Sequence, residues 1–410
     1  MSSTIKTDKV SFYRLSLVLL LSPLASLPLI MNEIIRGKHN LFPLLSCIMA
    51  LCSILTPPFA DLFRHSLVFE YYEGMGSDEL SYIFQDKDYV VPLLEYWFAK
   101  FGLHFEFIRG ILVFVCYQIS FRLYAELLNH IPQLKDSYKL RRIVFLTFFL
   151  IVPFIWITNG LRSATSCYLL AYAWLCIYNG KNLKGWCYAA MGVFTHFFGY
   201  AFIPFLLLMY ARKWHLRMSY AIYVISVIVF AVIGNVVLAQ ILGAMSEDSL
   251  STIGVTSGSI DYYTGAGEDS YSYAIMSVNG IIALFLERSI TIFIFLSTIL
   301  GRRKWANSFD LFFTRCLFLL WVLLSSSFTP FQRISWLILP IVLFLYIKNV
   351  PLPKLRNRAS WLLLCSIVGQ ISYIYGYREV FFQTPFYYLI LPLPFSAFYT
   401  YPLGFNAVQP

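Results

Sequence analysis

The sequence predicts an all-α protein that crosses a lipid bilayer many times. Of its 410 residues, 59% are hydrophobic and only 13% are charged, whereas a soluble domain carries about 25% charged residues. Apolar runs of bilayer length recur from one end of the chain to the other. No polar stretch is long enough for a separate soluble domain, so we expect a single integral membrane domain over residues 1–410.

The apolar runs predict a polytopic helical bundle of about ten to thirteen spans. In chain order the candidate spans are 12–31, 41–60, 107–128, 143–158, 163–178, 186–210, 219–242, 277–300, 309–328, 331–347 and 359–376. Gly192 and Pro204 interrupt the run 186–210, which favours two half-length or re-entrant helices. A last stretch, 385–401, contains several prolines and is either a short span or an interfacial segment.

Charge separates the connections between these runs into two classes. The basic connections, which we expect to face the cytoplasm, are 135–142, 179–185, 212–217, 301–304 and 348–358. This distribution explains the net charge of +10 without a nucleic-acid partner. The segments 61–106 and 243–276 are acidic and are predicted to form two larger periplasmic loops. The same alternation places residues 1–11 outside, despite their two lysines.

The two acidic loops direct attention to the outer face. Long connections are usually functional or disordered, and the basic face has none of this length. Within the first loop, residues 90–102 (VVPLLEYWFAKFG) are typical of a helix in the membrane interface. The second loop is rich in Gly, Ser and Tyr, and is either a mobile flap that stacks on sugars or an ordinary flexible loop.

Ionisable residues gather near the predicted outer leaflet, where positive-inside bias disfavours arginine. Arg162 lies between two spans, His196 lies where the interrupted run reaches the outer face, and Arg333 opens a later span. The remaining candidates in or beside the first outer loop are Arg64, Asp78, Tyr82 and Arg109. Arginine suits phosphate because its planar fork donates two hydrogen bonds and keeps its charge. A lipid-linked pyrophosphate is one ligand that would require these arginines.

Each candidate also has a structural interpretation. A single arginine at a helix end can reach the headgroups by snorkelling. A buried imidazole such as His196 can simply be satisfied by a backbone carbonyl, and Asp78 can form a turn after Gly76 and Ser77. For Arg162, Arg333 and His196 taken together we favour a functional role.

These stretches resemble the EpsG-like branch of the Wzy-type polysaccharide polymerases. That family has an Asp followed by a Tyr in the first outer loop, matched by Asp78 and Tyr82. It then has an Arg-Gln-x-x-Ala element, a short Lys-containing loop and a Phe-His pair, matched by LRSATS (161–166), NGKNLKG (179–185) and THFFGY (195–200). A late arginine that opens a span corresponds to Arg333.

The match covers about residues 60–350, with two departures from the family pattern. Ser163 stands in place of the usual Gln, and Thr195 stands in place of the usual Phe. Both substitutions leave the charged positions of the pattern in place.

The resemblance implies a multi-pass enzyme of the bacterial inner membrane that polymerises an O-antigen or exopolysaccharide. The donor would be a glycan on undecaprenyl pyrophosphate, the acceptor a repeat unit on the same carrier, and a chain-length regulator a further partner. His196 or Asp78 would accept the proton of the attacking hydroxyl. Arg162 and Arg333, with Arg64, would stabilise the leaving pyrophosphate.

Other functional classes fit the sequence less well. A transporter or flippase of lipid-linked oligosaccharides usually shows internal repeats, and the two halves of this chain show none. An O-antigen ligase shares the donor and the topology, so it stays an alternative, whereas an acyltransferase would place its site nearer the cytoplasm. We expect no cofactor and no metal, since phosphate-loop and dinucleotide signatures are absent and the eight cysteines lack paired spacing.

Overall fold

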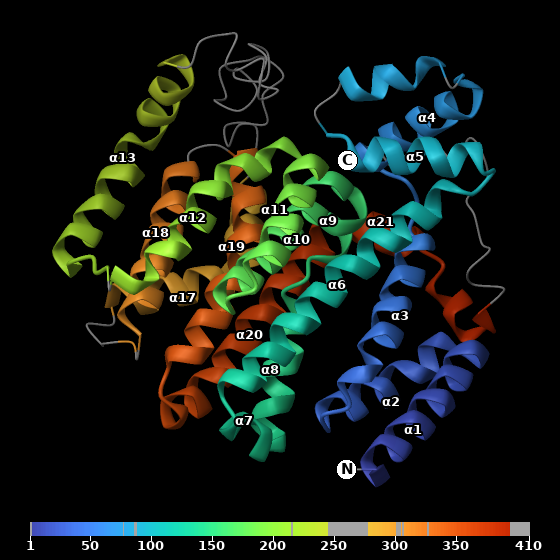
Figure 1. The fold of residues 1–410 in the computed structure, drawn as a ribbon, viewed down its shortest axis with the longest axis horizontal. Helices are drawn as coiled ribbons and strands as arrows, with labels where there is room; N and C mark the ends of the chain where they lie inside the picture. The colour runs from blue at the N-terminus through green and yellow to red at the C-terminus, as the bar shows by residue number, and fades with distance from the viewer. Residues whose placement is uncertain are drawn as a thin grey trace. The chain divides into compact units, whose positions relative to one another are not determined.

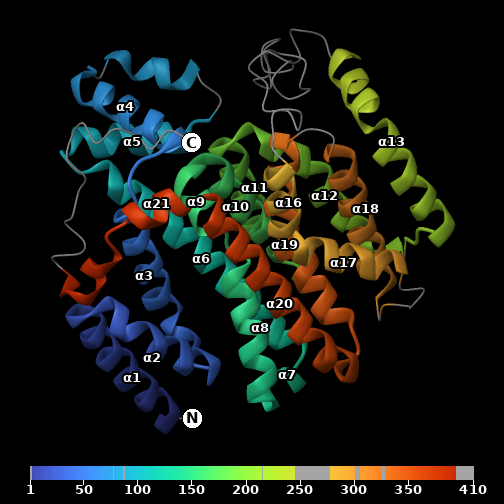
Figure 2. The same cartoon turned by 180° about the vertical axis from the view of Figure 1, so that it is seen from behind.

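The protein is an all-α membrane protein. The computed structural model describes residues 2–76, 78–85, 88–214, 216–244, 278–300, 305, 307–325 and 328–393. Every regular element within these residues is a helix (Figures 1 and 2). The helical segments among them that are long and apolar enough to cross a membrane are Phe105–His130, Tyr138–Asn159, Pro330–Asn349 and Leu352–Gly376. The total of ten to thirteen spans stays a prediction.

The helices group into two compact units, which are described separately. The first unit comprises residues 1–84, 89–165 and 377–410, and the second comprises 85–88 and 166–376. The expectation of one membrane domain over the whole chain stays a prediction.

The first unit is built around α6 (Phe105–His130), the longest helix in it. Its other helices are α1 (Ser2–Leu21), α2 (Pro23–Ile35), η1 (His39–Leu41), α3 (Phe42–Ile54), α4 (Ala60–Gly74), η2 (Asp78–Gln85), α5 (Val90–Lys100), α7 (Gln133–Asp136), α8 (Tyr138–Leu150), α9 (Phe154–Asn159), α21 (Arg378–Gln383) and η6 (Phe386–Ile390). Helix α3 packs along α6, because Gly110 presents no side chain where a Cβ would lie 3.0 Å from Ile54 Cδ1.

The expected single span over 12–31 is wrong, because the chain forms two helices there. Ser22 has an extended backbone, its side chain accepts a hydrogen bond from the Ala25 amide, and Pro23 is the first residue of α2. Serine at the N-cap followed by proline is a strong start signal for a new helix. Helix α2 then returns along α1 (Figures 1 and 2). The expected span over 41–60 is also shorter, since α3 ends at Ile54.

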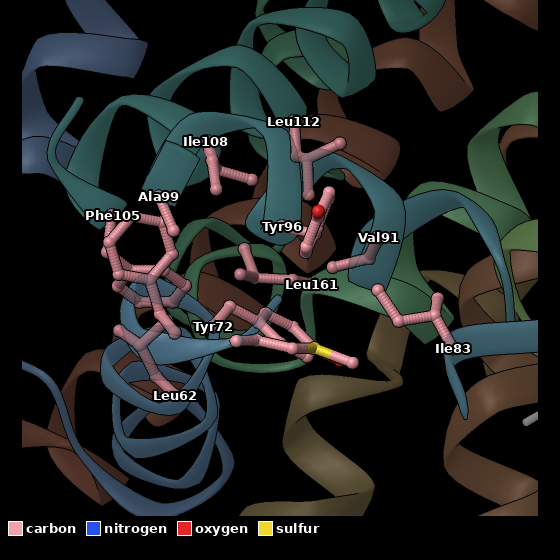
Figure 3. Packing of buried hydrophobic residues seen from close by; sticks show 12 residues of the cluster. Leu62, Tyr72, Ile83, Val91, Tyr96, Ala99, Phe105, Ile108, Leu112 and Leu161 are labelled. Carbon is pink, nitrogen blue, oxygen red and sulfur yellow. The ribbon is translucent and has the colours of Figure 1, made fainter. Parts of the chain in front are cut away.

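The first acidic loop is folded rather than irregular. Helices α4 and α5 pack on the beginning of α6 around a closed hydrophobic cluster (Figure 3). The buried side chains of this cluster are Leu62, Phe69, Tyr72, Met75, Ile83, Val91, Tyr96, Ala99, Phe105, Ile108, Leu112 and Leu161. The helix expected within 90–102 is present as α5. The segment therefore has a hydrophobic core of its own, which its many acidic residues do not indicate.

The second unit contains the rest of α10 (Leu161–Tyr178), which begins in the first unit, and a series of helices around it. These are α11 (Asn182–Thr195), η3 (Phe197–Phe202), α12 (Ile203–Leu208), η4 (Met209–Trp214), α13 (Tyr220–Ala244), α16 (Val278–Glu287), α17 (Ser289–Leu300), α18 (Ser308–Leu324), α19 (Phe328–Asn349) and α20 (Leu352–Gly376). Helices α10 and α19 are buried along almost their whole length, so they form the interior of the unit.

Two expected spans of the second unit are divided. The interruption of 186–210 is confirmed, since α11 ends at Thr195 and short helices follow it. The run 277–300 also consists of two helices, α16 and α17, which the sequence did not indicate. At this division a Cβ on Gly369 of α20 would lie 3.0 Å from the Glu287 carbonyl oxygen, and Ser289 donates a hydrogen bond to the Cys365 carbonyl, 2.6 Å away. Most of the loop 243–276 and the end of the stretch 385–401 lie outside the described residues.

A buried carboxylate joins three helix ends in the second unit. Asp310, near the start of α18, is 1% exposed. Its oxygens accept hydrogen bonds from Tyr178 Oη at 3.0 and 3.1 Å, Asn349 Nδ2 at 2.8 Å and Lys348 Nζ at 3.1 Å. Tyr178 ends α10, while Lys348 and Asn349 end α19. One carboxylate thereby fixes the register of three buried helices.

The close packing of α11 on α10 gives a stability prediction. A Cβ on Gly185 would overlap Ile177 and lie 3.1 Å from the Ala173 carbonyl oxygen. We expect Gly185→Ala to destabilise the protein by about 1–3 kcal/mol, the usual cost of overpacking. Lower thermal stability of the detergent-purified protein would show this.

Gly74→Ala is the matched control, because a Cβ on Gly74 meets nothing within 4 Å. Both substitutions bring the helix preference of alanine, so only the overlap distinguishes them. Equal unfolding temperatures for the two variants would contradict the close approach of α11 to α10.

Candidate functional site

His196 lies in the second unit beside a carboxylate that sequence reasoning did not select. Helix α11 ends at Thr195, and the extended backbone of His196 (φ −157°, ψ 128°) turns the chain into η3. Its Nδ1 lies 3.3 Å from Oδ2 of Asp88. The other carboxylate oxygen of Asp88 accepts a hydrogen bond of 2.9 Å from the Phe197 amide. Both side chains are buried, with 5% of His196 and 4% of Asp88 exposed.

The turn at His196 is held against α10 by small residues. Ser166 Oγ donates a 2.7 Å hydrogen bond to the carbonyl of Gly192, which lies one turn before His196. A Cβ on Gly199 would lie 3.1 Å from Val193 Cα and 3.3 Å from Ser166 Oγ. The glycines on both sides of His196 thus allow backbone to pack directly on α10, which fixes where the imidazole lies.

Arg333 lies at the same level of α10. It is in the first turns of α19 and is partly buried. Its carbonyl accepts a hydrogen bond from the Cys167 thiol, with 3.5 Å between sulfur and oxygen. Cys167 directly follows Ser166, which contacts the His196 turn. The structure therefore brings the His196–Asp88 pair and the start of α19 to neighbouring positions along one helix.

This arrangement can carry acid–base chemistry next to an anion. An imidazole whose Nδ1 lies beside a carboxylate can act as a base through Nε2. A nearby arginine can hold a phosphate group through charge-assisted hydrogen bonds. The second unit supplies both groups, in His196 with Asp88 and in Arg333.

The other arginine candidates lie in the first unit. Arg162 is partly buried in the first turn of α10, four residues before Ser166 on that helix. Arg64 is exposed and pairs with Asp61 at 3.2 Å. Arg109 is 1% exposed and donates a 2.8 Å hydrogen bond to the Ile54 carbonyl, where it closes the end of α3.

Asp78 and Tyr82 lie in η2, also within the first unit. Only their backbone belongs to the described part of the structure, so their proposed roles stay predictions.

The segment before Arg162 is tied to α4. Asn159, which ends α9, is buried, and its side-chain oxygen accepts a 3.1 Å hydrogen bond from the Leu62 amide. This contact caps the first turn of α4, whose amides have no partner within the helix. Leu161 packs into the hydrophobic cluster of the same helices. The chain segment that precedes Arg162 is therefore held against the folded part of the first acidic loop.

Two buried carboxylates of the segment 61–106 were missed from the sequence. Asp88 is one of many acidic residues in the segment 61–106, so nothing local distinguished it. Glu95 is 1% exposed, and its Oε1 lies 2.7 Å from Nδ1 of the buried His65. Its position inside the apolar run VVPLLEYWFA was a usable signal, because a carboxylate is rarely buried without a partner.

The His65–Glu95 pair leads to a prediction for the first unit. We expect Glu95→Ala to destabilise the packing of α4 on α5 by about 1–3 kcal/mol, because it leaves a buried imidazole without its partner. Limited proteolysis of the first acidic loop in membranes measures this directly. The variant should be cut faster than the wild-type protein.

Glu73→Ala provides the control for that experiment, since Glu73 is an exposed acidic residue of the same helix pair. It should be cut at the wild-type rate. If Glu95→Ala also resisted protease like the wild type, the pair would not be holding α4 and α5 together.

Among the described residues, no three His, Cys, Asp or Glu side chains gather in a way that could hold a metal ion. The chain was compared with known families and proteins. The profile of the EpsG family matches residues 60–395, which is most of the chain and includes every candidate residue above. Neither a curated protein nor a solved structure matches it.

Proposed function

The chain belongs to the EpsG family, and we propose that it polymerises a lipid-linked bacterial polysaccharide at the outer face of the inner membrane. Family membership supports a polysaccharide polymerase function in general. The helical membrane character of the chain fits a substrate carried on a lipid. O-antigen or exopolysaccharide repeat units on undecaprenyl pyrophosphate are the substrates that we propose.

In the proposed reaction, a sugar hydroxyl of the acceptor repeat unit attacks the anomeric carbon of the donor glycan. The new glycosidic bond forms as the bond between that carbon and the pyrophosphate oxygen breaks. The hydroxyl proton passes to Nε2 of His196, whose Nδ1 faces Asp88. The lipid pyrophosphate leaves with an additional negative charge.

We assign stabilisation of that charge to arginines. Arg333 belongs to the same unit as His196, and its backbone lies at the level of the His196 turn. Arg162, which belongs to the first unit, is the second candidate from the sequence, and its role stays a prediction. Preorganised donors that face developing charge are worth several kcal/mol in an enclosed site. Arg64 is a weaker candidate, since it is exposed and already pairs with Asp61.

The observation that carries the proposal is the buried Asp88–His196 pair within the region matched by the family. A histidine held only for packing needs no carboxylate at its ring nitrogen. The segments that carry this pair come from the first outer loop and from the end of α11. Asp78, the alternative proton acceptor, stays a prediction.

The test is a lipopolysaccharide gel from a strain lacking this gene, with and without a plasmid copy, together with an assay of secreted polysaccharide. We expect the ladder to collapse to core plus one repeat unit, or the secreted polymer to vanish while lipid-linked repeat units accumulate. Loss of even the single repeat unit would indicate a flippase or an earlier transferase instead. Full-length polymer that accumulates on its lipid carrier would indicate a ligase.

A further inference from the structure

One end of the first unit contains a group of aromatic and basic side chains that the proposed reaction does not use. His39, in η1 between α2 and α3, stacks on Phe42 with 5.1 Å between ring centroids. Its ring also meets the edge of Tyr124 at 6.0 Å. Tyr138 Oη donates a 2.9 Å hydrogen bond to Asn32 Oδ1. The connections 32–40 and 135–142 therefore lie together at this end of the unit (Figures 1 and 2).

Three buried polar atoms in this group have no hydrogen-bond partner in the structure. They are Nε2 of His39, Oη of Tyr124 and Nε of Arg141. Tyr124 is 0% exposed. The large majority of buried side-chain polar atoms in proteins have a hydrogen-bond partner, and leaving one without a partner is destabilising. The rings of His39 and Tyr124 are in contact and the charge of Arg141 acts on both, which indicates that one polar ligand completes the group.

The surroundings select an anion as that ligand. The positive charge of Arg141 acts on both His39 and Tyr124, and that of Lys135 acts on His39. Arg141 uses Nη1 to donate a 3.0 Å hydrogen bond to the Lys135 carbonyl, which orients the guanidinium and leaves its Nε without a partner. Burial lowers the pKa of His39, and the two cations lower it further. A bound anion would offset the repulsion between a protonated His39 and these two cations.

We propose that His39, Tyr124 and Arg141 form a binding site for a phosphate group. The three unpartnered atoms supply hydrogen bonds to phosphate oxygens, and Lys135 adds positive charge at the rim. Both connections that build the site are basic or flank basic residues, which places it on the cytoplasmic side by the positive-inside rule. The phosphate of an anionic phospholipid in the inner leaflet and free phosphate share this chemistry. The site is separate from the polymerase reaction and does not depend on it.

The test compares thermal unfolding of the full-length protein in detergent with four additives. Phosphatidylglycerol is compared with phosphatidylcholine at equal mole fraction, and sodium phosphate with sodium chloride at equal ionic strength. We expect phosphatidylglycerol, phosphate or both to raise the unfolding temperature above their controls. A rise with the lipid alone identifies a headgroup, and a rise with both shows that the free anion suffices. No rise above either control would overturn the proposal.

The variants make the test specific. Tyr124→Phe removes only a hydroxyl that has no partner, so the protein without additive should be as stable as the wild type or more so. Tyr124→Phe and Arg141→Gln should each weaken the apparent affinity for the additive about tenfold. Arg142→Gln removes the same charge from the next, exposed residue and should keep the wild-type affinity. Equal affinities in all three variants would assign the effect to general surface charge and refute the site.

Discussion

Replacement of His196 by alanine is expected to abolish polymer formation while leaving single lipid-linked repeat units in the membrane. A positioned general base contributes about 10²–10⁴-fold to a rate, and a loss of this size reduces a polymer ladder to its first band. Asp88→Asn should give a smaller loss, because the amide oxygen can still accept the Phe197 amide hydrogen bond while the negative charge beside Nδ1 is gone. The gel ladder and the amount of accumulated repeat unit measure both effects.

This experiment needs one control for the loss of a histidine elsewhere in the chain and another for folding. His104 is exposed and precedes α6 without capping it through its side chain, so His104→Ala should retain the full ladder. The amount of each variant in the membrane fraction shows whether it folds. A full ladder from a folded His196→Ala protein would remove this residue from the mechanism. If Asp88→Asn kept the full ladder while His196→Ala lost it, the role of Asp88 would be restricted to packing.

Replacement of Asp310 by alanine is expected to produce the largest loss of stability in the second unit. It would leave Tyr178, Lys348 and Asn349 without the buried carboxylate that they share. Removing one partner of a buried charged pair typically costs about 3–5 kcal/mol, because the remaining charge keeps its desolvation penalty. The unfolding temperature of the purified protein should therefore fall by many degrees, and the yield from membranes should fall with it.

The comparison that isolates this effect uses Asp136, an exposed aspartate of α7. Asp136→Ala removes the same side chain from a solvated position and should leave the unfolding temperature within experimental error of the wild type. Asp310→Asn should fall between the two, since an amide oxygen still accepts hydrogen bonds but carries no charge to offset Lys348. An Asp310→Ala protein as stable as the wild type would mean that the three helix ends are held by other contacts.

The sequence predicts the buried helices well and the interruptions poorly. Helices α6, α19 and α20 correspond to long apolar runs in the sequence. These runs are long enough to predict membrane-spanning helices. The break at Ser22 was readable, because Ser-Pro starts a helix. The break at Arg288, between α16 and α17, was not readable from the sequence. It accompanies the close approach of Gly369 on α20, a helix that is distant in the sequence.

The candidate site shows the same division. His196 and Arg333 were selected because charged groups beside apolar runs are costly and need a reason. Asp88 lies 109 residues before Phe197, to which it bonds, and only the folded chain shows that it meets His196. Glu95 was visible as a charge inside an apolar run, yet its partner His65 lies 30 residues away.

The α1–α2 pair changes how the beginning of the chain enters the bilayer. A helix followed by a second helix that runs back along it returns the chain to the side from which it started. With this arrangement we expect Lys6 and Lys9 to stay on the cytoplasmic side, which is the ordinary preference of lysine. We therefore expect α1 and α2 to enter the bilayer together, from one side, as a pair of helices.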